Sequence, residues 1–96
     1  MDVKKLDVST RNGNVDTDFE FTLNNPEIDT LASDVTNAAL TAFCIANLGP
    51  VAGPVLAVYL ISHINDVVNN RGPNGAYVKT TIRNQAVMHI WQVYPQ

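Results

Sequence analysis

Positions 35–65 carry no formally charged side chain, and every Asp, Glu, Lys and Arg of the 96-residue chain lies outside them. Two Gly-Pro pairs, Gly49-Pro50 and Gly53-Pro54, interrupt this apolar middle. Glycine accepts the backbone conformation that ends a helix, and proline cannot continue one. The pattern therefore predicts two apolar helices joined by a short loop over residues 49–53.

The ends of these two helices are marked by capping and breaking residues. Asn25 can cap the first helix, and Pro26 suits its first helical position. Apolar residues then recur every three or four positions to about Leu48. The second helix is predicted to open at Pro54 and to run to about Asn70, with apolar residues around more than one face.

Four β-strands are predicted outside the apolar middle. Asn-Gly at positions 12–13 is typical of a type I′ turn, because both residues tolerate positive φ. The segment that follows alternates strictly between apolar and mainly acidic side chains, as a half-buried strand does. The expected strands cover residues 2–10, 15–23, 76–82 and 86–94.

The element order ββ-αα-ββ predicts an α+β fold in a single domain, residues 1–96. We expect a four-stranded antiparallel sheet packed on a helical hairpin, in two layers. Pairing the two β-hairpins through the first and last strands would make 86–94 central and leave the acidic face of 16–22 on an outer strand. Strand 86–94 is apolar on both faces, which predicts that both faces are covered.

Composition and missing motifs argue against several classes of function. The six Lys and Arg residues are dispersed, so we expect no nucleic-acid partner. No apolar run follows the N-terminal lysines, so a cytoplasmic location is the default expectation, and a cleaved leader stays an open alternative. The chain contains no nucleophile elbow, phosphate-binding glycine loop or dinucleotide fingerprint, which favours a protein that is not an enzyme and needs no cofactor.

A few side chains are candidates for a chemical role. His63 with Asp66 three residues on, together with His89, could form a proton-transfer or metal site, although surface or interface imidazoles are the simpler interpretation. The single cysteine, Cys44, lies in an apolar helix and is expected to be a buried, inert thiol. We therefore predict no catalytic residue and no metal ligand.

The amount of apolar helix suggests burial against something beyond the monomer. A small sheet and one neighbouring helix can cover only part of the surface of a helix that is apolar all round. The sequence thus favours a homo-oligomer or protein-binding module that uses the hairpin and the last strand, with its contact residues at Val55, Tyr59, Ile64, His89 and Trp91.

The alternative is a membrane-active protein of toxin or immunity type whose hairpin, residues 35–65, inserts into lipid. Each apolar arm is shorter than the about 20 residues that a spanning helix needs. The mean hydropathy of 0.00 also favours a soluble chain.

Overall fold

The computed structural model confirms the α+β class, with the elements in the order ββ-αα-ββ. It describes residues 1–33, 37–84 and 87–96, and the side chains of Asn37 and residues 87–89 lie outside this description. The elements are β1 (Asp2–Arg11), β2 (Asn14–Leu23), α1 (Asn25–Ser33), α2 (Asn37–Asn70), β3 (Ala76–Arg83) and β4 (Val87–Pro95).

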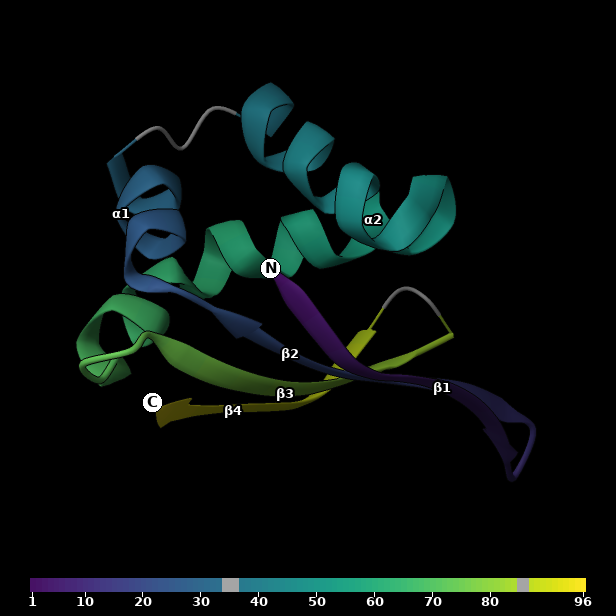
Figure 1. Ribbon diagram of the computed structural model, residues 1–96. Helices are drawn as coiled ribbons and strands as arrows, with labels where there is room; N and C mark the ends of the chain where they lie inside the picture. The colour runs from purple at the N-terminus through teal and green to yellow at the C-terminus, as the bar shows by residue number, and fades with distance from the viewer. Residues whose placement is uncertain (34–36, 85–86) are drawn as a thin grey trace.

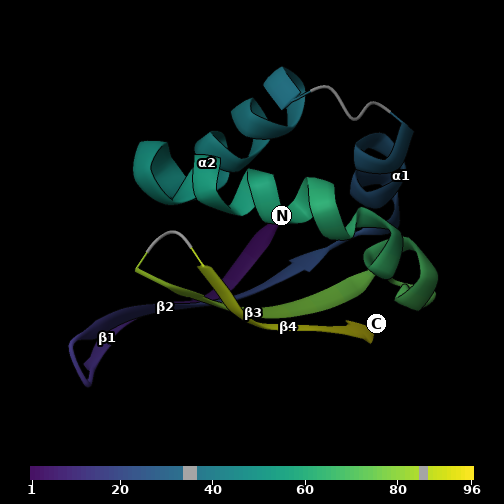
Figure 2. The same cartoon turned by 180° about the vertical axis from the view of Figure 1, so that it is seen from behind.

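All four strands form one antiparallel sheet, and both helices cover the same face of it (Figures 1 and 2). The strand order is β1-β2-β3-β4. The predicted order was therefore wrong: β2 and β3 are the central strands, and β4 lies at an edge. The acidic face of residues 16–22 consequently lies in the middle of the sheet.

The central position of β2 follows from side chains that β3 places opposite its carboxylates. Across the two strands, Asp16 faces Arg83, Asp18 faces Thr81 and Glu20 faces Lys79. Opposite charges and hydroxyl groups directly across an antiparallel pair stabilise it, whereas like charges destabilise it. On the helix-covered face, Phe19, Phe21 and Leu23 of β2 are buried in the core.

The turn between β1 and β2 has the predicted conformation. Asn12 and Gly13 have φ values of 50° and 81°, which fit a type I′ turn, and Arg11 pairs with Asn14 on either side of it. A register shift between Val3 and Lys5 places a bulge at Lys4.

Helix α1 is capped one residue earlier than predicted. The Glu27 amide donates to Asn24 Oδ1 at 2.8 Å, and the Asn24 amide donates to Glu27 Oε1 at 3.0 Å. This reciprocal pair is a capping box, so the cap is Asn24 and not Asn25. The side-chain Nδ2 of Asn25 instead donates to the carbonyl oxygens of Gly72 and Pro73, which ties the start of α1 to the loop before β3.

The predicted first helix is divided between two elements. α1 ends at Ser33, and α2 begins at Asn37 in a different direction (Figure 1). Each part buries its own apolar residues: Ile28 and Leu31 in α1, and Leu40 and Cys44 in the first arm of α2. The residues that join the two helices, including Val35 of the predicted pattern, lie outside the described part of the chain.

The helical hairpin lies within α2, where Gly49 alone departs from helical geometry, with φ 90° and ψ 175°. This conformation is almost restricted to glycine. The break is therefore one residue long, and the predicted loop over 49–53 was too wide. Helical structure resumes at Pro50, because proline is tolerated in the first turn, where no intrahelical N–H bond is required.

The two arms of α2 approach most closely at Gly53. A Cβ atom on Gly53 would lie 2.7 Å from both the backbone nitrogen and the Cα of Ile45. The second arm, residues 50–70, runs beside the sheet, and the first arm lies over it on the side away from the strands (Figures 1 and 2). The missing side chain at Gly53 is what permits this contact.

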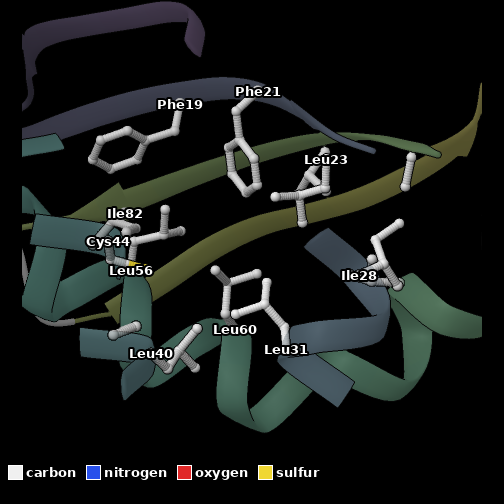
Figure 3. Close-up of a cluster of buried hydrophobic side chains, with 14 residues drawn as sticks. Phe19, Phe21, Leu23, Ile28, Leu31, Leu40, Cys44, Leu56, Leu60 and Ile82 are labelled. Atoms are coloured by element: carbon white, nitrogen blue, oxygen red, sulfur yellow. The ribbon is translucent and has the colours of Figure 1, made fainter. Parts of the chain in front are cut away.

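The core fills the space between β2, β3 and the helices (Figure 3). Phe21 and Leu23 point from the sheet toward Leu60 of α2 and Ile28 of α1. Cys44, Leu56 and Ile82 are also completely or almost completely buried. Burial of such side chains, at roughly 1.5–3 kcal/mol each, is the main favourable contribution to folding.

β4 is covered on one face only, in contrast to the prediction. Trp91 and Val93 are half-buried against the core, whereas Ile90 and Tyr94 on the opposite face are exposed. The register of β4 shifts between Thr81 and Ile82, whose partners are Ile90 and Met88. This shift leaves His89 as the additional residue of a β-bulge. The second apolar face of β4 therefore lies on the open side of the sheet.

Candidate functional site

An apolar groove of about 370 Å³ lies between the bend of α2 and the strands β1 and β2. The bend lies on the helix-covered side of the sheet, above the region where β1 and β2 extend toward their turn (Figure 1). Only Thr17 contributes a hydroxyl, and no lining residue is charged. The lining residues are Leu6, Val8, Thr17, Phe19, Leu48, Pro50, Val51, Ala52, Val55 and Ile82.

The rim of this groove exposes large apolar side chains from two elements. Leu6 and Val8 of β1 are exposed, and Val51 in the first turn after the bend has 63% of its surface accessible. They remain open because the second arm of α2 packs over β3 and β4 rather than over β1. An exposed apolar patch that continues into a groove is typical of an interaction site.

Of the contact residues predicted from the sequence, Val55, Tyr59, Ile64 and Trp91 are all half-buried and pack against the core. Val55 also lines the groove, and the other three do not. The side chain of His89 lies outside the described residues.

Leu6, Val8 and Val51 are not among the contact residues predicted from the sequence. Their apolar character is visible in the sequence, but their exposure depends on β1 being an edge strand and on the direction of α2 after Gly49. No local pattern in the sequence indicates which strand lies at the edge of the sheet or in which direction α2 continues after Gly49.

His63 contacts Trp91 rather than Asp66. The two rings lie 4.9 Å apart between centroids, with an angle of 39° between their planes. His63 Nδ1 lies 2.9 Å from the carbonyl oxygen of Tyr59, and Nδ1 is the donor in this contact because a carbonyl can only accept. Within the described residues, no group of three or more His, Cys, Asp and Glu side chains could hold a metal ion.

The indole Nε1 of Trp91 is buried and finds no hydrogen-bond acceptor among the described residues. Such an atom costs stability, because it gives up water without a replacement. Together with the imidazole contact, this places Trp91 and His63 in the packing between α2 and β4.

The open face of the sheet carries a polar cluster whose carboxylates have partners within the protein. Arg83 donates from two nitrogens to the two oxygens of Asp16, at 2.9 and 3.2 Å. This pairing raises the pKa of the guanidinium. Thr81 donates to Asp18 at 2.7 Å, and Tyr77 donates to Glu20 at 2.7 Å. These contacts link β2 to β3, so the acidic side chains of β2 serve to hold the two strands together.

Cys44 is a buried thiol, as predicted. Its side chain is fully inaccessible, and burial raises the pKa of the thiol to about 11. Because the nucleophilic form of cysteine is the thiolate, the native protein should react very slowly with thiol reagents.

The raised pKa of Cys44 gives an expected dependence of stability on pH. An unfolded thiol ionises near pH 8.5, so between about pH 9 and 11 the folded state retains a proton that the unfolded state has lost. The contribution of Cys44 is fully present below pH 8.5 and is lost as the pH rises through the folded value. Urea unfolding at pH 8 and pH 10.5 should show a smaller alkaline loss for Cys44→Ala than for the wild type; equal losses would contradict a buried thiol.

Residues 38–70 form one helical segment that is long and apolar enough, by length and composition alone, to cross a membrane. In the structure this segment bends at Gly49. About 28% of its most apolar window is buried within the protein.

No protein-family model, curated protein or solved structure matches this chain. The fold and the site therefore define a class, a small α+β protein with a helical hairpin and an open apolar groove.

Proposed function

We propose that this protein is a self-associating or partner-binding module whose contact surface is the groove between the bend of α2 and β1. The exposed apolar rim formed by Leu6, Val8 and Val51 carries this proposal. Burying such side chains against a second protein surface removes them from water and provides the driving force for association. The nearby helix and strands are held by the core, so the surface is formed before binding.

Val51→Asp tests this surface. We expect the wild type to form a species larger than its 10.5 kDa monomer at micromolar concentration, and we expect the variant to sediment as a monomer. A charge buried in an apolar interface is costly, so the association should weaken at least about tenfold. Sedimentation velocity measures the mass, and circular dichroism confirms that the variant is folded.

Val58→Asp is the matched control, because Val58 lies on the same helix and is 61% exposed but does not line the groove. It should associate as the wild type does. A wild type that is monomeric throughout this concentration range would contradict self-association. Dissociation by Val58→Asp, without an effect of Val51→Asp, would contradict the groove as the contact surface.

The apolar character of the two arms of α2, which carry no charge up to residue 65, favours a second candidate function, insertion of the hairpin into lipid. The bend at residues 49–54 would enter first, because it carries no charge and exposes Val51. Dye release from anionic liposomes at pH 7 and pH 5 tests this candidate. Release that Val51→Asp reduces would support it, and no release at either pH would contradict it.

A further inference from the structure

β1 is an edge strand whose free backbone groups can be assigned from its turn. In a hairpin with a two-residue loop, the residues flanking the turn form a hydrogen-bonded pair, here Arg11 and Asn14. Hydrogen-bonded and non-hydrogen-bonded pairs then alternate along the ladder. Leu6 and Val8 fall at non-hydrogen-bonded positions, so their own N–H and C=O groups point away from β2 to the open edge.

A second copy of the same edge can pair with β1 only in a few symmetric registers. Two antiparallel β1 strands related by a two-fold axis normal to the sheet must have one residue opposite itself. An axis at Lys5 or at Asp7 would set like charges face to face. An axis at Val8 would place Lys5 opposite Arg11 of the other copy. An axis at Ser9 would set Asp7 opposite Arg11 of the other copy, but it places the small polar Ser9 at the centre of the contact.

An axis at Leu6 sets opposite charges opposite each other around an apolar centre. Lys5 of each copy then faces Asp7 of the other, twice per dimer, and both side chains lie on the open face of the sheet. Leu6 meets its own copy on the helix-covered face, through a hydrogen-bonded pair. The bulge at Lys4 ends the regular ladder, so the pairing is confined to residues 5–7 of both strands.

We propose that two copies of this chain associate through β1 in antiparallel fashion, with Leu6 on the two-fold axis and Lys5 paired with Asp7 of the second copy. This inference rests on the proposed function and specifies its partner. The result is a continuous eight-stranded sheet with the helices of both copies on one side.

The environment of Asp7 within one chain supports this register. Asp7 lies directly opposite Asp18 of β2, a like charge, and its side chain is well exposed. Lys5 Nζ lies 3.8 Å from Asp7 and 3.8 Å from Glu20. A lysine of the second copy across the open edge would add a positive charge beside Asp7 and offset its repulsion from Asp18.

The same register brings together one residue, Leu6, of each apolar rim. Leu6 lines the groove of its own copy, and in the dimer it lies beside Leu6 of the other. The exposed Leu6 side chains, and the grooves that they line, would then adjoin across the axis. The contact therefore combines a short backbone ladder, two ion pairs and an apolar centre.

Cysteine cross-linking tests the register directly. Residues in a hydrogen-bonded antiparallel pair have Cα atoms about 5.5 Å apart, within the range that a disulfide spans. Leu6→Cys should therefore give a disulfide-linked dimer when treated with diamide, which accepts the two electrons and two protons of the thiols. Val8→Cys is the control, because in this register the two residues at position 8 lie about 14 Å apart. The wild type should not cross-link, since its only thiol is buried.

Charge reversal provides an independent measurement. Lys5→Asp and Asp7→Lys should each weaken association about tenfold or more, and the double variant should recover to within about threefold of the wild type. Lys79→Asp is a matched control: Lys79 also lies 3.8 Å from Glu20 and is 46% exposed against 44% for Lys5, but it belongs to a central strand. It should leave association unchanged.

The outcomes separate this proposal from the one on which it rests. A wild type that dimerises while Leu6→Cys does not cross-link would overturn the register. A dimer that cross-links at neither position and ignores both charge reversals would overturn pairing through β1, while leaving self-association through another surface in place. A monomeric wild type would overturn both.

Discussion

Replacing Gly75 with alanine should destabilise this protein by about 3 kcal/mol or more, a large part of the roughly 5–14 kcal/mol expected for a chain of this size. Gly75 has φ +114°, and a Cβ atom at this position would lie 2.0 Å from the carbonyl oxygen of Leu23. The atom that must move belongs to the β2 backbone, next to the Leu23–Ala76 pair that joins β2 and β3. The ladder would have to open locally to accommodate one methyl group.

Gly13→Ala separates the conformational strain of a positive φ from the steric contact with Leu23. Gly13 also has positive φ, +81°, but a Cβ atom there would meet no other atom within 4 Å. It should therefore cost only the conformational strain, about 1–2 kcal/mol. Urea unfolding followed by circular dichroism gives both values. Equal losses for Gly13→Ala and Gly75→Ala would show that strain alone, and not the contact with Leu23, requires glycine at position 75.

Gly53→Ala should also destabilise the protein, by about 2 kcal/mol or more. Alanine is the better helix former by about 1 kcal/mol, so propensity alone predicts a gain. The contact predicts a loss, because the new Cβ atom would lie 2.7 Å from the backbone of Ile45 in the other arm. The cost of this contact should exceed the gain in helix propensity, because neither backbone can move without separating the two arms of α2.

Val58→Ala is the control for Gly53→Ala. Val58 lies on the same arm with most of its surface exposed, so alanine there tests helix propensity with little loss of packing. The expected change is within about 0.5 kcal/mol, in the stabilising direction. If Gly53→Ala instead raised the urea midpoint, the close approach of the two arms would be incorrect.

Local patterns in the sequence predicted the parts of the fold that depend on neighbouring residues. Asn12-Gly13 forms the predicted type I′ turn, because the φ values it needs are properties of those two residues. The alternation of residues 15–23 predicted which side chains of β2 face the core, and Phe19, Phe21 and Leu23 are buried. The burial of Cys44 was predicted from its apolar helical surroundings.

Predictions that required choosing between distant partners were less successful. The strand order was wrong, because joining strands by their apolar content ignored the pairing of Asp16 with Arg83 and of Glu20 with Lys79 across β2 and β3. The helix cap differs from this case, because it is a local feature: Asn25 was the predicted cap, whereas Asn24 and Glu27 have the spacing of a capping box and form it.

The candidate site was the least predictable part of the molecule. Val55, Tyr59 and Ile64 were all named from the sequence and all pack against the core, and of the three Val55 also lines the groove. All three are apolar residues of one helix. Which of them lines the groove depends on how that helix crosses the sheet.

The sequence by itself determined the class of fold, the position of the turns and the bend at Gly49, because backbone conformation and hydrophobic periodicity act over a few residues. Tertiary structure alone decided the strand order and the exposure of Leu6, Val8 and Val51. Long-range pairing and helix crossing arise from the mutual fit of whole surfaces, which no short segment of sequence contains.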